Sequence, residues 1–485
     1  MLSVAALLSA CGGGGGGRNA PVTGGNGGGI ATSNPTPGPT PPPVAGTGGG
    51  CSLRERQDWA AAQLREWYLF PETLPTTFDP TPFGSVDTYV DALTATARGQ
   101  RRDRFFTYLT SIREEDAFYA SGASAGFGIR LSVGGDGRQV FINETFEGTP
   151  AAAAGIDRGD EILAIGSSDT PLRSIPEYLN FGGPDPIAVA LGEDRVGVTR
   201  TLRIRNAAGT RLVTLAKADY DIPPVSSRYG ARVLTDGGRR VGYINLRTFI
   251  ASADPALRAA FAGFRRDGIT DVIVDLRYNG GGLISIAELM VDLLGRDRTT
   301  SDVQGYTSFR PEKASNDIVR FFERQPESIA PTRVAFIGTG GTASASELVV
   351  NAFTPYLRGR SALIGGNTFG KPVGQIALDR PACDDRLRVV AIAVQNSARS
   401  AAYFDGLAAT VGASCAAGDD LAFPLGDPRE SSVARALDFL AARPCTPISP
   451  TPSATAGLSG RALGGMELLM PSTPTAAQRE VPGLF

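Results

Sequence analysis

The side chains best suited to chemistry in this chain are a serine and a lysine. The sequence has no histidine and only three lysines beside 44 arginines. One lysine is Lys371, and the run of small residues 342–347 lies upstream of it and contains Ser344. A serine nucleophile here needs a base other than histidine, and arginine is unsuitable because a guanidinium keeps its proton in proteins. Ser344 and Lys371 are therefore the first catalytic candidates.

A lysine that acts as a base must be neutral. Its ordinary pKa of about 10.4 has to fall by about three pH units, which corresponds to roughly 4 kcal/mol against the charged form. Burial disfavours an ammonium in this way. Phe369 and Pro372 flank Lys371, and no acidic residue lies between 363 and 378. Gln375 is placed to orient the amine by a hydrogen bond without adding charge.

We assign no catalytic role to the other two lysines or to a phosphate-binding pattern that ends at Lys371. Lys217 and Lys313 lack comparable neighbours and are predicted to lie on the surface. Residues 365–371 match the G-x-x-x-x-G-K phosphate-binding pattern, but Pro372 stands where Ser or Thr would hold Mg²⁺ and has no N–H to donate. No nucleotide site is predicted.

The elements that position these residues alternate between strand and helix over residues 224–442, which predicts an α/β domain with a largely parallel sheet. Strands are predicted at 241–246, 272–276, 334–337 and 389–394, and helices at 257–264, 284–294, 346–357 and 433–442. The segments 275–282 and 342–347 each follow a strand and precede a helix, where open α/β sheets hold their sites. Ser344 would then lie at a helix N-terminus. The N–H of Ala345 and that of Gly280 or Gly281 are candidate oxyanion donors.

Two further regions precede this domain. Aromatic and apolar residues recur at helical spacing between 53 and 120. Residues 122–216 show strand periodicity, and 148–163 predict a short helix with Pro150 at its start and Gly155 at its end. This region resembles a PDZ domain, which implies that Phe127, Gly128 and Ile129 bind the terminal carboxylate of an extended peptide. The alternative is a small β-rich domain without a ligand.

The N-terminal region and the cysteines indicate export. Residues 8–11, Leu-Ser-Ala-Cys, look like a bacterial lipobox that would place a lipid on Cys11, followed by a Gly/Pro-rich tether. The alternative is a disordered N-terminus with a chance cysteine. Four other cysteines allow three pairings. We favour Cys383–Cys415 with Cys51–Cys445, and four buried free thiols are the alternative.

These motifs together resemble the C-terminal processing peptidases (tail-specific proteases) over residues 53–442. The resemblance rests on residues 275–282, on Thr-Ala-Ser-Ala-Ser-Glu at 342–347, on Thr-Phe-Gly-Lys with a glutamine four residues later, and on the preceding PDZ-like region. It implies that Ser344 is the nucleophile, Lys371 the general base and Gln375 its orienting partner. Ala345 and the glycine pair after Asn279 would stabilise the oxyanion.

The expected fold is multidomain α/β, with an N-terminal helical segment, a PDZ-like β-rich domain and a crotonase-like α/β catalytic domain. The expected parts are a signal-like segment (1–11), a disordered tether (12–50), a helical domain (51–120), a PDZ-like domain (121–218), the peptidase domain (219–445) and a disordered tail (446–485).

The resemblance implies a serine endopeptidase that cleaves proteins near free C-termini, needs no metal or cofactor and sits in the bacterial cell envelope, lipid-anchored to the outer membrane and facing the periplasm. The net charge of −2 gives no sign of nucleic-acid binding. The alternatives are an inactive PDZ scaffold of the same fold and a crotonase-like acyl-thioester enzyme.

The last residues, Val481 to Phe485, are apolar and of the kind that a PDZ groove binds. We expect this segment to occupy its own or a neighbour's groove and to restrain activity.

Overall fold

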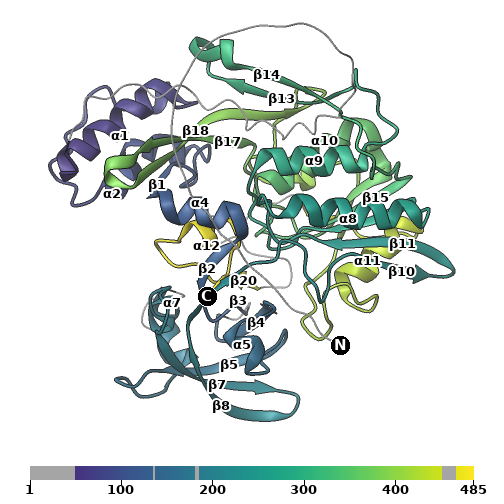
Figure 1. Ribbon diagram of the computed structural model, residues 1–485, viewed down its shortest axis with the longest axis horizontal. Helices are drawn as coiled ribbons and strands as arrows, with labels where there is room; N and C mark the ends of the chain where they lie inside the picture. Colours follow the sequence, from purple (N-terminus) through teal and green to yellow (C-terminus); the bar gives the residue numbers. More distant parts are fainter. Residues whose placement is uncertain (1–49, 135–136, 181–184, 450–465) are drawn as a thin grey trace, which may run out of the picture. The chain divides into compact units, whose positions relative to one another are not determined.

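A computed structural model describes residues 50–134, 137–180, 185–449 and 466–485 (Figure 1). The predicted signal-like segment, Cys11 and almost all of the tether lie outside these residues. Within the described ranges, no helix is long and apolar enough to cross a membrane.

A six-stranded sheet forms the centre of the α/β domain, in the order β10-β11-β12-β15-β16-β19. β10 and β11 are antiparallel, and the remaining neighbours are parallel. The strands are β10 (Arg232–Asp236), β11 (Arg239–Asn245), β12 (Asp271–Asp275), β15 (Arg333–Gly338), β16 (Ser361–Gly365) and β19 (Ser414–Ala416). The predicted α/β class is therefore confirmed.

Helices cover both faces of this sheet because its strands are apolar on both sides (Figure 1). In β12, Val272 and Val274 pack with α8 (Ala253–Arg266), α9 (Ile284–Leu294) and α10 (Ala345–Leu357). Ile273, between them, points to the other face and packs with α11 (Ser431–Leu440).

A second sheet is antiparallel. It contains Gln375, and the loop that holds Lys371 leads directly into it. Its order is β1-β18-β13-β14, and β17 also pairs with β18. The strands are β1 (Tyr108–Ser111), β13 (Val303–Phe309), β14 (Ile318–Phe321), β17 (Val373–Arg380) and β18 (Asp385–Asn396). Residues 389–394 were predicted within the parallel sheet and instead belong to β18.

The N-terminal helices share a core with this antiparallel sheet. They are α1 (Leu53–Trp67), α2 (Val86–Leu93) and α3 (Ala95–Gly99). Leu64 and Tyr89 of the helices and Val389 of β18 lie in one buried cluster. Ser52 begins α1 with a capping box, in which Ser52 and Glu55 satisfy each other's backbone N–H groups.

The PDZ-like domain is built on β3, β4, β5, β7 and β8, paired in that order (Figure 1). Its elements are β3 (Ile129–Val133), β4 (Val140–Thr145), α5 (Pro150–Ala153), β5 (Glu161–Gly166), β6 (Arg173–Ser174), α6 (Ile175–Asn180), α7 (Asp185–Leu191), β7 (Thr199–Asn206) and β8 (Gly209–Ala216). The short helix α5 starts at Pro150 as predicted, and Thr149 caps it by accepting from the Ala152 N–H. The strands β2 (Ala123–Gly126) and β9 (Ala218–Asp221) pair at the entry and exit of the domain, and α4 (Ile112–Ser121) precedes β2.

Residues 466–485, which we call the 466–485 segment, are ordered, so the predicted disordered tail is wrong for this part. The segment contains β20 (Glu467–Leu468) and α12 (Ala476–Glu480), and β20 pairs with β3. Val481, Leu484 and Phe485 are buried. These buried apolar side chains stabilise the segment, which its overall composition did not reveal.

The disulfides also differ from the favoured pairing. Cys51 pairs with Cys383, and Cys415 pairs with Cys445. Cys383 lies in the turn between β17 and β18, and β18 packs beside α1, so Cys51 at the start of α1 meets it there. Cys415 lies in β19, and the N–H of the next residue, Ala416, donates at 2.7 Å to the carbonyl of Thr446, directly after Cys445.

Lys217 is buried, not on the surface as predicted. Its side chain is fully enclosed, and its ammonium donates to Asp194 at 2.6 Å and to the Gly192 carbonyl at 2.8 Å. Lys313 is paired with Glu66 at a partly exposed position.

Candidate active site

Ser344 lies in the turn between β15 and α10, directly before the first helical residue. Its backbone has φ 54° and ψ −114°, a conformation that a residue with a side chain seldom adopts. A Cβ placed on Gly281 would lie only 2.8 Å from the Ser344 Cβ. The glycine-rich turn after β12 therefore touches the serine, as the order of the parallel strands predicts.

Glu347 joins the Ser344 turn to the Lys371 loop. One of its carboxylate oxygens accepts from Ser344 N at 3.0 Å and from Lys371 N at 2.7 Å. The other accepts from Gly370 N at 2.7 Å and from the Thr368 hydroxyl at 2.6 Å. The Glu347 side chain is fully buried, so these four hydrogen bonds replace those that water would make to an exposed carboxylate. The main chains of the two candidate catalytic residues thus meet at a single oxygen atom.

The Lys371 amine is held by uncharged groups. It donates to the Gln375 Oε1 at 2.7 Å, and it lies 5.1 Å from the centre of the Phe106 ring. Gln375 in turn donates to the Phe106 carbonyl. Burial lowers the pKa of Lys371, and the charge of Glu480 opposes that shift. Among the described residues, the amine bonds to Gln375 and not to the Ser344 hydroxyl.

The candidate oxyanion donors differ in what they bind. Gly281 N–H donates to the Asn279 side chain at 2.9 Å, so it is already engaged. Gly280 N–H donates at 2.9 Å to the main-chain carbonyl of Glu480, in the 466–485 segment. Ala345 N–H has no acceptor within the part of the chain that the structure describes. In this structure the Ala345 N–H is therefore free to receive a developing oxyanion, whereas the Gly280 N–H can do so only after the Glu480 carbonyl leaves it.

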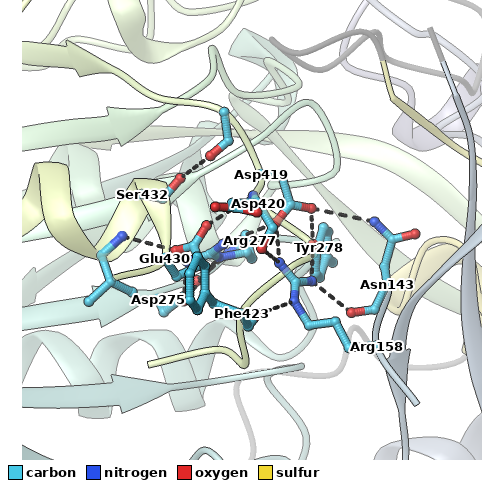
Figure 2. A network of polar contacts seen from close by, with 12 residues as sticks. Asn143, Arg158, Asp275, Arg277, Tyr278, Asp419, Asp420, Phe423, Glu430 and Ser432 are labelled. Atoms are coloured by element: carbon cyan, nitrogen blue, oxygen red, sulfur yellow. Dashed lines mark hydrogen bonds and ion pairs between the residues drawn. The ribbon is translucent and has the colours of Figure 1, made fainter. Parts of the chain in front are cut away.

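A buried ionic network fixes the strand end that carries Gly280 (Figure 2). Arg277 is fully buried and ion-pairs with Asp275, Asp419 and Glu430. Arg158, from the PDZ domain, donates to Asp419 at 2.6 Å and to the Tyr278 hydroxyl at 3.0 Å. The network links the PDZ domain to the turn after β12.

The predicted peptide-binding loop of the PDZ domain holds the 466–485 segment. Gly128 N–H and Ile129 N–H donate to the Phe485 carbonyl oxygen at 3.0 and 3.1 Å, and Phe485 N–H donates to the Ile129 carbonyl at 2.9 Å. Leu131 N–H donates to the Gly483 carbonyl at 2.8 Å. The end of the segment therefore pairs with the edge of β3 through an antiparallel bridge between Leu484 and Arg130, which resembles the mode by which PDZ domains bind peptides. Phe127 is buried behind the loop.

A cavity of about 80 Å³ lies between Lys371 and the 466–485 segment. Lys371 and Gly280 line one side, and Leu468, Arg479 and Glu480 line the other. The side chain of Glu480 accepts from the Tyr119 hydroxyl at 3.0 Å.

Several important residues could not be identified from the sequence. Glu347 stood at the end of the small-residue run, but nothing in its spacing showed that four donors from two segments converge on it. Arg130, a PDZ residue only 1% exposed, donates at 2.8 Å to both the Tyr278 and Pro482 carbonyls. In the alternating strand pattern at 129–133, Arg130 falls on the polar side, where a solvent-exposed side chain is expected. Its contacts are therefore visible only in the folded structure.

Comparison with known proteins assigns the two domains. Residues 240–397 match the family model "Peptidase family S41", and residues 119–177 match "PDZ domain". The first range contains Gly280, Ser344, Lys371 and Gln375, and the second contains the loop at Phe127–Ile129. The chain is a multidomain α/β protein that combines a PDZ domain with an S41 peptidase domain.

Curated relatives are named as C-terminal processing peptidases. The chain is 29% identical over 271 residues to "C-terminal processing peptidase, chloroplastic" of Tetradesmus obliquus, covering 53% of this chain and 54% of that protein. It is 29% identical over 265 residues to "Carboxyl-terminal-processing protease" of Picosynechococcus sp., covering 54% and 58%. The chain thus spans little more than half the length of these relatives.

A solved structure shares the fold. The putative S41 protease from Bacteroides fragilis NCTC 9343 superposes with a TM-score of 0.59 at 21% identity, over 79% of this chain and 97% of that chain. At this level of identity the likeness concerns the architecture.

Proposed function

We propose that the protein is a serine endopeptidase that cleaves protein substrates near their C-termini, with Ser344 as nucleophile and Lys371 as general base. The observation that carries this proposal concerns the Glu347 carboxylate. One of its two oxygens accepts hydrogen bonds from the main-chain N–H groups of both Ser344 and Lys371 and so holds the two segments together. The burial that lowers the pKa of Lys371 supports its role as a base.

The chemistry follows from these positions. Neutral Lys371 accepts the proton of the Ser344 hydroxyl as its oxygen attacks the substrate carbonyl. The negative charge that develops on the carbonyl oxygen is stabilised by the N–H groups of Ala345 and Gly280. Lys371 then gives its proton to the leaving amine, an acyl-enzyme remains, and water releases the shortened product by the same proton transfers.

The PDZ domain supplies the substrate preference. The edge of β3 and the N–H groups of Gly128 and Ile129 would hold the last residues of a substrate as an added strand. The chain upstream of that anchor would then pass Gly280, as the 466–485 segment does, and extend from there toward Ser344.

The test is incubation of unfolded proteins with varied C-termini, read by mass spectrometry. Wild type should yield C-terminally shortened products. Lys371→Ala should lose at least about 100-fold in rate, as expected for removal of a general base. Lys313→Ala is the matched control and should retain the wild-type rate, because Lys313 forms its ion pair with Glu66 at a partly exposed position and does not line the cavity beside Lys371. A Lys371→Ala protein that cleaves at the wild-type rate would refute the assignment.

The same samples distinguish the alternative functions. A serine-reactive fluorophosphonate should label wild type and not Ser344→Ala. If no label and no product appear although peptides still bind, the protein is a non-catalytic PDZ scaffold. Hydrolysis of acyl-thioesters without peptide cleavage would indicate the crotonase-like enzyme.

We also propose that the protein is anchored in the bacterial cell envelope by a lipid on Cys11, at the outer membrane and facing the periplasm. The Leu-Ser-Ala-Cys sequence at 8–11 supports the lipid, and two disulfides suit an oxidising compartment. Metabolic labelling with a fatty acid should mark wild type and not Cys11→Ser. Equal partition of both proteins into detergent would contradict the anchor.

A further inference from the structure

The 466–485 segment occupies two sites that a substrate would need. Its Phe485 carbonyl takes the N–H groups of Gly128 and Ile129 in the PDZ loop, and its Glu480 carbonyl takes the N–H of Gly280 at 2.9 Å. Arg130 bridges the two sites, because it donates at 2.8 Å to Pro482, within the segment, and to Tyr278, two residues before Gly280.

Burial indicates that this arrangement is a stable one. Val481 is fully buried, and Leu484 and Phe485 are 2% and 3% exposed. Val481 and Leu484 pack with Phe118 and Phe146, which belong to α4 and the PDZ domain. The Gln478 side chain donates to the Leu484 carbonyl at 3.0 Å and closes the turn between α12 and the extended end.

The peptide bond presented at Gly280 is protected by its conformation. Glu480 is the last residue of α12, and the N–H of Val481 donates to the Ala477 carbonyl at 2.8 Å as the next helical bond. The amide nitrogen of the Glu480–Val481 bond is therefore held within a helical turn. A leaving nitrogen has to accept a proton and depart, which this turn opposes, so the segment can occupy the site without being cut.

We propose that residues 476–485 act as an intramolecular pseudosubstrate, which a protein substrate displaces from the PDZ groove and from Gly280 before Ser344 can react. The proposal rests on the function proposed above. The ligand class that competes is a polypeptide with a free carboxylate and a large apolar last residue, like the Gly-Leu-Phe that occupies the groove. The Glu480 charge acts in the same direction, since it favours the protonated form of Lys371.

Binding tests the occupancy without requiring catalysis. A fluorescent Val-Pro-Gly-Leu-Phe peptide with a free carboxylate is titrated against full-length Ser344→Ala, alone and combined with Phe485→Asp or with removal of residues 481–485. Because a tethered competitor acts at an effective concentration of about a millimolar, both combined variants should bind at least about tenfold more tightly. Leu212→Asp is the matched control, since Leu212 is 59% exposed on β8, and it should bind as the parent does.

Activity tests the inhibition. With an internally quenched peptide whose C-terminus is amidated, Phe485→Asp should exceed the wild-type rate at least about tenfold, by the same argument. Free Val-Pro-Gly-Leu-Phe should activate wild type but not Phe485→Asp, and the amidated form of the peptide should activate neither. Phe485→Asp retains Val481 and Leu484 in their cluster, so it keeps the test valid if the truncated chain does not fold.

The outcomes separate this proposal from the proposed function. Equal peptide affinity in all the Ser344→Ala proteins, or equal rates for wild type and Phe485→Asp, would overturn the pseudosubstrate while leaving the peptidase intact. Tighter binding in the variants with no hydrolysis by any protein would support the occupancy of the groove and refute the peptidase.

Discussion

At the scale of the residue, the oxygen that the Lys371 amine contacts is uncharged. Gln375 Oε1 accepts the amine at 2.7 Å, and the Gln375 amide is itself held by the Phe106 carbonyl. An amide orients the amine without stabilising its charged form as strongly as a carboxylate would. This choice of side chain suits a base that must be neutral.

Gln375→Glu tests that argument with a side chain of nearly the same shape. The carboxylate should raise the pKa of Lys371 by about one pH unit or more, because an opposite charge favours the ammonium. The neutral amine then appears only at higher pH, so the acidic limb of the kcat/KM profile should move to higher pH. The measurement is peptide hydrolysis between pH 5 and 10.

Gln375→Met serves as the control, since it keeps the length but cannot accept the amine. It should lower the rate without moving the limb upward. An unchanged profile in Gln375→Glu would show that this amine is not the titrating base.

Ser344 and Lys371 could be selected as candidates at this scale because composition left few alternatives. With no histidine in the chain, the candidate bases were the three lysines, and only Lys371 lies in a stretch without acidic residues. Glu347 could not be predicted, because its role depends on donors at 344, 368, 370 and 371 that come together only in the folded chain.

At the scale of the element, two turns that follow parallel strands meet at the site. The turn after β12 brings Gly281 against Ser344, with room for a hydrogen but not for a methyl group. Gly281 also has φ 128°, outside the range that other residues adopt readily. Glycine is required here on two counts.

Gly281→Ala should therefore displace Ser344 and reduce kcat/KM by about 100-fold or more, since small misplacements of a nucleophile have effects of that size. Gly359→Ala is the matched control, because nothing lies within 4 Å of the added Cβ. It should retain both the rate and the thermal midpoint. A Gly281→Ala enzyme as fast as wild type would show that this contact does not position the serine.

The turns were predictable because strand, glycine-rich segment and helix follow one another in the sequence, and parallel strands end at the same edge. The antiparallel sheet was not. Residues 389–394 have the pattern of a buried strand, but such a pattern does not identify the partner strand. They pair with β17 and β13, and the first residues of the same strand pair with β1, where Tyr108 lies opposite Arg388.

At the scale of the whole molecule, contacts between segments far apart in the sequence determine two features that the sequence did not predict, namely the order of residues 466–485 and the disulfide pairing. The 466–485 segment was expected to be disordered from its composition, but its apolar residues are covered by the PDZ domain and α4. The disulfides likewise depend on which termini and loops meet, and four cysteines allow three pairings before the fold is known.

Asp419 is one of the residues that join the PDZ domain to the peptidase domain in the buried network (Figure 2). It accepts from Arg158 at 2.6 Å and from Arg277 at 3.1 Å, and it also binds the Tyr278 hydroxyl. Burial favours its neutral form, but the two guanidinium charges outweigh that effect and hold the pKa of Asp419 well below its ordinary value. The carboxylate is therefore charged in the folded protein at neutral pH.

Asp419→Asn should lower the free energy of unfolding by about 3 to 5 kcal/mol at pH 7, because Arg158 is left buried without its carboxylate. A depressed pKa contributes stability that is fully present above the ordinary value of about 3.9 and is lost as the pH falls below it. The difference between wild type and Asp419→Asn should thus be largest at pH 7 and shrink below about pH 4. Urea unfolding at pH 7, 5 and 3.5 measures this difference.

Asp427→Asn provides the matched control, since Asp427 forms an ion pair with the largely exposed Arg429. Exposed pairs contribute at most about 1 kcal/mol, so this variant should unfold close to the wild-type midpoint at every pH. If Asp419→Asn behaved like Asp427→Asn, the buried network would not be what holds the PDZ domain against the turn that carries Gly280. Displacement of the 466–485 segment would then free the candidate site only by removing the segment's direct contacts there, such as the one between the Glu480 carbonyl and the Gly280 N–H.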